Sequence, residues 1–426
     1  PQVVAPRRAG VEYAVEHDRA RDRLLVLTNR DDAVDFQLMQ APVADPGAWE
    51  ALVAHRPGVR LEDVDAFADH LVLTERAEAA VRLRVLDPAT GEGEVLDLDD
   101  PTAITHLGAV VDDTTSVVRV VTTSLTAPPT VLDVDLATDE RVVRKQQEVP
   151  GYDPDDYVSD RVWATAEDGT RVPISLVRHR DTPLDGSAAG FLYGYGAYEL
   201  STDPEFSPWR LTLLDRGVVY AIAHVRGGGE LGRAWYEQGR LEHKATTFTD
   251  FVACADHLVD TGVVARDRLA IFGGSAGGLL IGATLNLRPD LCRAAVAVVP
   301  FVDVLSTMSD ATLPLTVPEY EEWGDPNVAE VAATIRSYSP VDNVREAEYP
   351  ALLVTAGLND PRVGYWEPAK WVATLRDHAT GDRPILLRTE LGAGHGGPSG
   401  RYDAWRERAL FAAFVLDQVE AVDAPT

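Results

Sequence analysis

The stretch IFGGSAGGLL, residues 271–280, places a serine between two glycine pairs directly after an apolar run. Gly273, Ser275 and Gly277 fill the pattern G-x-S-x-G, in which a sharp turn between a strand and a helix exposes a serine hydroxyl. The residues before the turn predict a strand, and the run LLIGATLNL after it predicts a helix. A turn that only begins a helix, or a phosphate loop, is the alternative, but the Gly-Lys-Ser/Thr ending of a P-loop is absent. The stretch therefore predicts a nucleophilic serine at the edge of a sheet.

A serine hydroxyl is a weak nucleophile without a base, so a histidine oriented by a carboxylate should accompany it. In α/β hydrolases these residues follow in the chain order Ser, Asp, His. Asp360 comes directly after the predicted strand ALLVTAG (351–357), and His395 comes after the predicted strand PILLRTE (384–390). Both lie in loops at the carboxyl ends of strands. The sequence thus predicts a Ser275–His395–Asp360 triad, in which His395 moves the proton and Asp360 fixes its tautomer.

Predicted strands and helices alternate around these motifs from about residue 150 onward. Buried strands are predicted at 191–195, 218–225, 294–300, 351–357 and 384–390, and helices at 247–262, from 276, at 366–379 and at 401–419. This alternation predicts a doubly wound, mostly parallel sheet with helices on both faces, as in an α/β hydrolase.

The first 150 residues consist of short β-branched runs broken by turn residues, and one phrase recurs in them. LLVLT ends at Thr28, LVLT at Thr74 and VRVVT at Thr122. A several-stranded repeat of this length is typical of β-propeller blades, and three hairpins in a small sandwich are the alternative. A propeller closes with roughly four to eight blades, whereas 150 residues supply about three. We therefore expect either no propeller or the C-terminal part of a longer protein, with its earlier blades removed or on another chain.

Composition restricts the function. A net charge of −29 over 426 residues disfavours nucleic-acid binding and favours a cationic ligand, although general solvation of the surface would also explain it. No apolar run approaches the roughly 20 residues that cross a bilayer. Cys254 and Cys292 lack metal or redox spacing, so we expect buried thiols and neither a metal nor a cofactor. No secretory signal is visible, which favours the cytoplasm, although the chain starts at Pro1 without a methionine.

A family resemblance supports and extends these predictions. The chain resembles the oligopeptidase B branch of the prolyl oligopeptidase family of serine peptidases over nearly all of residues 149–420, and more weakly over 1–148. The resemblance implies a partial propeller domain at 1–148, made of the C-terminal blades of a seven-bladed propeller, and an α/β-hydrolase catalytic domain at 149–426. The motifs that carry it are VPGYDPDDYVS (149–159), LYGYGAYE (192–199), AIAHVRGGGELGRAWYEQG (221–239), TFTDFVACADHL (247–258), GGSAGGLL (273–280), VPFVDVL (299–305), EYEEWGDPN (319–327), YWEPAKWVA (365–373) and AGHGG (393–397).

The same resemblance implies roles for residues that the pattern alone does not single out. The backbone N–H of Ala276 and the hydroxyl of Tyr195 match the donors of the oxyanion hole, and Arg362 matches an arginine that binds the substrate backbone. The family carries a histidine where Asn359 stands and an N–H donor where Pro361 stands, so we expect Pro361 to alter the loop that aims Asp360.

Acidic residues account for the implied specificity. Glu319 and Glu321 match a pair that binds Arg or Lys on the amino side of the cleaved bond, which suits the forked donors of a guanidinium. Asp203 and Glu205 fall where the family carries acids that favour a second basic residue. In so acidic a chain, any of these carboxylates is otherwise a solvated surface group.

The resemblance implies a serine endopeptidase that cleaves short peptides after Arg or Lys through an acyl-enzyme. Two alternatives remain open. One is an acylaminoacyl-peptidase or esterase on the same fold, favoured if Glu319 and Glu321 point away from the pocket. The other is a non-catalytic fragment whose triad is not assembled, or one that needs a separate chain for its missing blades.

Overall fold

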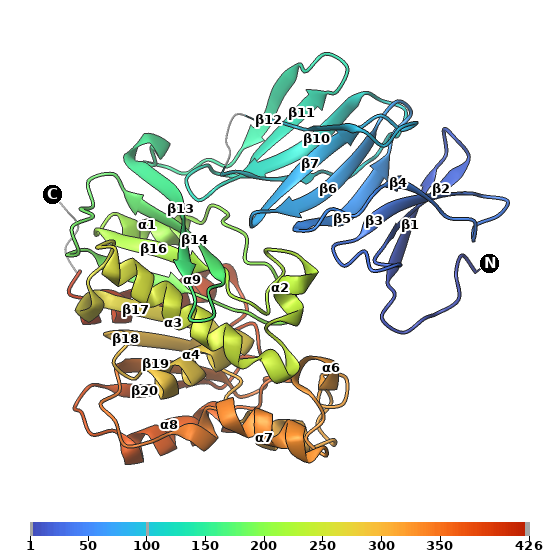
Figure 1. Ribbon diagram of the computed structural model, residues 1–426. Helices are drawn as coiled ribbons and strands as arrows, with labels where there is room; N and C mark the ends of the chain where they lie inside the picture. The colour runs from blue at the N-terminus through green and yellow to red at the C-terminus, as the bar shows by residue number, and fades with distance from the viewer. Residues whose placement is uncertain (1–2, 99–101, 422–426) are drawn as a thin grey trace. The chain divides into compact units, whose positions relative to one another are not determined.

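The computed structural model describes residues 3–98 and 102–421 (Figure 1). The chain forms two compact units. The first comprises residues 1–154 with the short segments 203–206 and 229–235, and the second comprises 155–202, 207–228 and 236–426. The main division lies close to the predicted boundary at 148/149, but two segments of the later sequence belong to the first unit.

Three four-stranded antiparallel sheets, each made of consecutive strands, form the first unit, and these are propeller blades. The recurring phrases lie on the second strand of each sheet along the chain: β2, β6 and β10. The strands are β1 (Tyr13–Asp18), β2 (Arg23–Thr28), β3 (Gln37–Pro42) and β4 (Glu50–Val53); β5 (Val59–Ala66), β6 (Leu71–Ala77), β7 (Ala80–Leu86) and β8 (Gly93–Val95); and β9 (Ile104–Leu107), β10 (Val117–Thr123), β11 (Thr130–Asp135) and β12 (Arg141–Gln146).

Alternation of apolar and polar residues along these strands builds two small cores. Leu25 and Leu38 of the first sheet pack with Leu61 and Leu73 of the second, and all four are buried. Val72 of the second sheet packs with apolar residues of the third. Successive strand residues face opposite sides of a sheet, so the middle sheet contributes to both cores.

The second unit is built around an eight-stranded sheet with the order β13-β14-β16-β15-β17-β18-β19-β20. β13, β14 and β16 pair antiparallel, and the strands from β16 through β15 to β20 pair parallel. The strands are β13 (Tyr157–Thr165), β14 (Arg171–His179), β15 (Ala189–Tyr193), β16 (Val218–Ala223), β17 (Leu269–Gly274), β18 (Ala294–Val298), β19 (Ala351–Gly357) and β20 (Ile385–Glu390). This is the predicted α/β-hydrolase sheet.

Helices cover both faces of this sheet (Figure 1). Helices α3, α4 and α8 pack on one face, and α1 and α9 lie together on the other. The helices are α1 (Leu211–Leu214), α2 (Arg233–Glu237), α3 (Ala245–Asp260), α4 (Ala276–Leu287), α5 (Val304–Ser309), α6 (Tyr320–Trp323), α7 (Ala329–Tyr338), α8 (Trp366–His378) and α9 (Arg401–Gln418). Because the parallel strands end at one edge, the loops after β15, β17, β18 and β19 can meet there.

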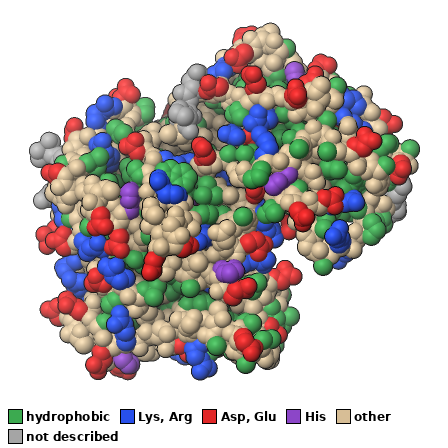
Figure 2. Space-filling model, viewed as in Figure 1, with side chains coloured by type: hydrophobic (Ala, Val, Ile, Leu, Met, Phe, Trp, Pro, Cys, Tyr) green, Lys and Arg blue, Asp and Glu red, His purple; other side chains and the backbone are tan. Residues whose placement is uncertain are grey.

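Acidic side chains are scattered over the face of the molecule that Figure 2 shows, among basic and apolar ones. Such a spread is what general solvation of the surface predicts for a chain of net charge −29. Within residues 3–98 and 102–421, no helix is both long and apolar enough to span a membrane.

Candidate active site

The turn between β17 and α4 has the geometry of a nucleophile elbow. Ser275 adopts φ 56° and ψ −118°, a strained conformation that the surrounding backbone must hold. Its N–H donates to the carbonyl of Val298 at 2.8 Å, and its carbonyl accepts the N–H of Phe301 at 3.1 Å. A Cβ at position 273 would lie 2.2 Å from the Gly277 carbonyl oxygen, so Gly273 has to be glycine. The glycines therefore allow the close approach that turns the serine outward.

His395 and Asp360 complete a hydrogen-bonded chain with this serine. The Nε2 atom of His395 lies 3.0 Å from the Ser275 Oγ, and its Nδ1 lies 2.7 Å from the Asp360 Oδ2. The Asp360 side chain is 1% exposed and that of His395 is 17% exposed. The imidazole is thus partly accessible, while the carboxylate bonded to it is shielded from water. The structure brings the three predicted residues together.

Asp360 is held by its own loop despite the proline that follows it. Its Oδ1 accepts the N–H groups of Arg362 at 2.8 Å and Val363 at 3.0 Å. These two donors come after Pro361, so the missing N–H of the proline does not leave the carboxylate unsupported. Asn359 donates its backbone N–H to the Ala393 carbonyl at 3.0 Å, which ties this loop to the one that carries His395.

Two hydrogen-bond donors stand near the serine. Ala276 is the first residue of α4, so no carbonyl within the helix can accept its N–H. Tyr195 follows β15, and its hydroxyl interacts with the Ser275 side chain. Burial raises the pKa of the Tyr195 phenol, and the charges of Glu322 and Glu319 raise it further. The phenol therefore stays protonated at neutral pH and can donate a hydrogen bond.

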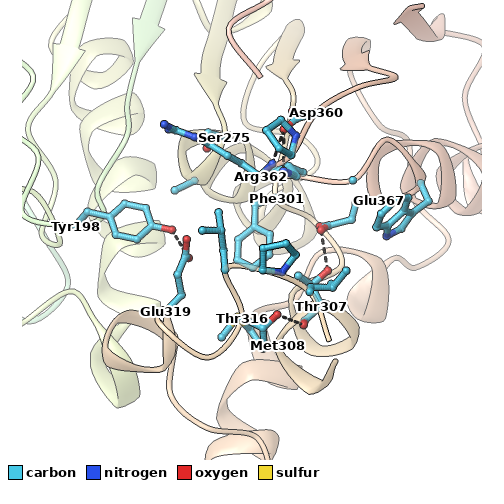
Figure 3. Close-up of a pocket in the computed structure, with 18 of the residues that line it drawn as sticks. Tyr198, Ser275, Phe301, Thr307, Met308, Thr316, Glu319, Asp360, Arg362 and Glu367 are labelled. Atoms are coloured by element: carbon cyan, nitrogen blue, oxygen red, sulfur yellow. Dashed lines mark hydrogen bonds between the residues drawn. The ribbon is translucent and has the colours of Figure 1, made fainter. Parts of the chain in front are cut away.

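Ser275, Ala276 and Tyr195 all line a cavity of about 580 Å³. Figure 3 shows Ser275 with other residues of the cavity wall. Glu319 lies on the cavity wall, where its Oε2 accepts the Tyr198 hydroxyl at 2.6 Å and the Trp323 indole N–H at 2.8 Å. Both donors use the same carboxylate oxygen, and no described side chain donates to Oε1. Apolar side chains form much of the remaining wall: Phe301, Met308, Leu313, Leu315 and Trp366.

The other predicted binding residues are placed differently. Arg362 lines the cavity, but Glu321 is exposed on α6 and does not line it. Asp203 and Glu205 belong to the first unit and are not among the lining residues. The Asp203 carboxylate accepts two hydrogen bonds from the Arg76 guanidinium, the longer one at 3.2 Å. The Asp203 carboxylate, to which the family resemblance gives a second basic residue of the substrate, is thus paired with Arg76 in this structure.

Two acidic residues near the cavity were not predicted from the sequence. Glu367 lines the cavity from the first turn of α8, and burial raises its pKa from 4.5 to about 7. Its carboxylate accepts the N–H groups of Val302 at 3.0 Å and Asp303 at 2.9 Å. Glu322, next to Glu321, is buried and accepts the Tyr198 N–H at 3.1 Å. The sequence signals for Glu367 and Glu322 were the predicted helix from residue 366 and the run YEEW (320–323), but neither pattern reveals that these two side chains are buried.

Comparisons with known proteins agree with this geometry. Residues 204–421 match the prolyl oligopeptidase family, and residues 1–147 match the N-terminal β-propeller domain of prolyl oligopeptidase. The chain is 47% identical to dipeptidyl aminopeptidase BI of Pseudoxanthomonas mexicana, over 98% of this chain and 58% of that protein. It is 40% identical to protease 2 of Moraxella lacunata, over 98% of this chain and 60% of that protein.

A solved structure is also similar to this chain in fold and sequence. Oligopeptidase B from Trypanosoma brucei, in a closed form with covalently bound antipain, superposes with a TM-score of 0.94 and 42% identity. The match covers 99% of this chain and 61% of that one. The present chain thus spans about three fifths of the length of the relatives it matches.

Proposed function

This chain belongs to the prolyl oligopeptidase family, and we propose that it is a serine endopeptidase that hydrolyses short peptides on the carboxyl side of Arg or Lys. The observation that carries this proposal is the hydrogen-bonded chain from Ser275 through His395 to Asp360, at a cavity whose wall carries Glu319. The likeness to protease 2 and oligopeptidase B supports it.

The triad performs acyl transfer in two steps. His395 Nε2 takes the proton of Ser275 as the Oγ attacks the carbonyl carbon of the peptide bond. The carbon–nitrogen bond then breaks, and the leaving amine receives that proton from His395. Water attacks the resulting ester with His395 again acting as base, which releases the acid and restores the serine. The buried Asp360 stabilises the imidazolium in both steps.

The oxyanion that forms in each step is stabilised by two donors. Ala276 and Tyr195 line the same cavity as Ser275, and the hydroxyl of Tyr195 interacts with the Ser275 side chain. Because these donors are fixed before the reaction, they favour the charged transition state over the neutral carbonyl. Their position relative to Ser275 supports the roles that the family resemblance implies.

Glu319 is the acid that selects a basic residue. Tyr198 and Trp323 fix one oxygen of its carboxylate, and the other oxygen is available to a guanidinium or ammonium. The apolar wall around Phe301 suits the methylene stem of Arg or Lys, which packs well on apolar surfaces. Glu321 has no part in this proposal, because it is exposed outside the cavity.

Hydrolysis of matched peptides tests the proposal. The peptides differ only in the residue before the cleaved bond, which is Arg, Lys, Phe or Pro. We expect cleavage after Arg and Lys, and a loss of more than about 1,000-fold in kcat for Ser275→Ala. Glu319→Gln should lower kcat/KM for the Arg peptide about 10- to 100-fold, the value of a charge-assisted hydrogen bond.

Glu321→Gln is the matched control, because it removes the same charge two residues later in the chain, outside the cavity. Its kcat/KM should stay within about twofold of the wild type. Equal losses in Glu319→Gln and Glu321→Gln would contradict the role of Glu319. Cleavage without any basic preference would favour an acylaminoacyl-peptidase or esterase.

The relative from P. mexicana favours a second candidate function, because its name describes removal of dipeptides. Such an enzyme requires a free α-amino group two residues before the cleaved bond. Peptides with free and acetylated N-termini separate the two functions. Cleavage that acetylation abolishes would replace the endopeptidase proposal with an aminopeptidase one.

A further inference from the structure

Lys244 is a fully buried lysine at the start of α3. Its ammonium donates to the carbonyls of Gly196 and Gly239, the second at 3.2 Å. The same nitrogen lies 5.1 Å from the centre of the Trp323 ring. Burial of a charged lysine costs free energy unless hydrogen bonds and an opposite charge compensate for the lost water. The two carbonyls and the ring supply part of this compensation.

Glu322 supplies the opposite charge. It is buried, and its carboxylate accepts the Tyr198 N–H at 3.1 Å and the Tyr236 hydroxyl at 2.6 Å. Its attraction for Lys244 favours the protonated amine. The backbone from Gly196 to Tyr198 is therefore held at two points, one carbonyl by a cation and one N–H by an anion.

This backbone segment connects the two halves of the candidate site. Tyr195 precedes Gly196 and supplies the oxyanion donor, whereas the Tyr198 hydroxyl bonds to Glu319. Tyr198 has φ 61°, a left-handed conformation that residues other than glycine avoid. Without the contacts to Lys244 and Glu322, we expect this left-handed backbone conformation to relax to a more favourable one.

We infer that Lys244 and Glu322 are positioning residues that fix the Tyr195–Tyr198 loop, so that one buried pair of charges controls both the oxyanion donor and the acid that selects the substrate. Trp323 extends this control, because it contacts the Lys244 ammonium on its ring and donates its N–H to Glu319. The inference rests on the proposed peptidase function.

A pH dependence follows from the charge of Lys244. Burial lowers the pKa of Lys244 to about 8, and Glu322 opposes this shift. As pH rises through 8, the amine loses its charge and Glu322 is left without a cation. We therefore expect kcat to fall on the alkaline side. The titratable and charged groups near the pair include Glu319 of the cavity wall, Tyr195 and Tyr198 of the loop, Tyr236 of α2 with Arg240 over its ring, and Tyr338 of α7.

The phenols of Tyr195, Tyr198 and Tyr338 do not account for such a fall. Burial raises the pKa values of Tyr195, Tyr198 and Tyr338 above their ordinary value of 10. These groups stay protonated through the range in which Lys244 titrates.

The experiment measures kcat and KM for the Arg and Phe peptides between pH 6 and pH 10. The variants are Lys244→Met and, as a matched control, Lys145→Met, which removes an exposed lysine of β12. We expect wild type and Lys145→Met to lose activity with a midpoint near pH 8. Lys244→Met should have a kcat lowered at least about 10-fold at pH 7, a smaller preference for Arg over Phe, and no midpoint near pH 8.

Glu322→Gln keeps the result decisive if Lys244→Met does not fold. Glutamine can still accept the Tyr198 N–H, but it no longer favours the charged amine. The midpoint should therefore move down by at least about half a pH unit. An unchanged midpoint in either variant, or a kcat of Lys244→Met within about threefold of wild type, would overturn the inference.

Labelling of Ser275 by a fluorophosphonate separates this inference from the proposed function. The reaction needs the serine and the Tyr195 loop but no peptide. A labelling rate that falls near pH 8 in wild type and not in Lys244→Met supports the inference, whether or not a peptide is cleaved. If no peptide is cleaved, only the proposed function fails. A labelling rate without that fall overturns the inference.

Discussion

Replacement of Glu367 by glutamine should stabilise the protein in a pH-dependent way. Burial raises the pKa of Glu367 from 4.5 to about 7, and the charge of Asp303 adds to this effect. A raised pKa means that the folded state binds the proton more tightly than the unfolded state does. Ionised Glu367 therefore lowers stability as pH rises from 4.5 toward 7, and the full cost is present above pH 7.

The pKa shift sets the size of the effect. At about 1.4 kcal/mol per pKa unit, a shift from 4.5 to about 7 corresponds to about 3 kcal/mol at pH 8. At pH 5.5 only about 1 kcal/mol of this cost is present, because most of the folded molecules keep the proton. The cost of the ionised carboxylate thus differs by about 2 kcal/mol between the two pH values.

Glutamine suits this site because it can keep the existing contacts. Its carbonyl can accept the N–H groups of Val302 and Asp303, and its amide can donate to the Thr307 hydroxyl, which now donates to Glu367 at 2.7 Å. The substitution removes the titration without a change of volume. The increase in the free energy of unfolding from wild type to Glu367→Gln should therefore be about 2 kcal/mol larger at pH 8 than at pH 5.5.

Thiol labelling in urea measures this difference for the second unit, which contains Glu367. Cys254 and Cys292 are both buried in the second unit, so their exposure reports the unfolding of that unit alone. Glu346→Gln, an exposed change in the same unit, should show no such pH dependence. The reasoning is refuted if Glu367→Gln changes stability equally at both pH values, or destabilises the protein more at pH 8.

Three further outcomes are expected. Tyr195→Phe should lower kcat about 100-fold with little change in KM, measured with the Arg peptide, because only the transition state loses a hydrogen bond; an unchanged kcat would exclude the phenol as an oxyanion donor. Gly278→Ala should yield little folded protein on gel filtration, since its Cβ would lie 2.4 Å from the Cβ of Pro300; wild-type yield and activity would contradict this. Without urea, Cys254 and Cys292 should not react with a thiol reagent at pH 8, because both are buried and burial raises the pKa of each; rapid reaction of either would be inconsistent with this packing.

The elbow, the alternating sheet and the blade repeats could be predicted because each follows from residues close together in the sequence. The pattern around Ser275 fixes its own turn, and strand ends place Asp360 and His395 at the same edge. The short helices α5, α6 and α7 were not predicted, since pieces of four to ten residues carry a weak periodic signal. Their stability comes from packing rather than from propensity.

The acids illustrate what the sequence could not reveal. Glu319 and Glu321 look equivalent in PEYEEWG, but this stretch forms a helical turn, in which residues three or four apart share a face. Glu319 lines the cavity and accepts the indole N–H of Trp323 four residues later, whereas Glu321 is exposed and does not line the cavity. Asp203 pairs with Arg76, and no local pattern could show a partner that far away in the chain. Lys244 likewise lies in a polar stretch that gives no sign of burial.

The segments 203–206 and 229–235 lie in the later sequence yet belong to the first unit. The chain therefore enters the first unit three times, and no single cut separates the two units. A protein engineer who expressed residues 155–426 alone would retain both segments without the blades they pack with. Phe206, which is 8% exposed here, would lose its contact with Tyr152, and the N–H of Arg233 would lose Asp35. The catalytic half should thus behave as a poor independent module, and exchange of blades between relatives should succeed only when these two segments are exchanged with them.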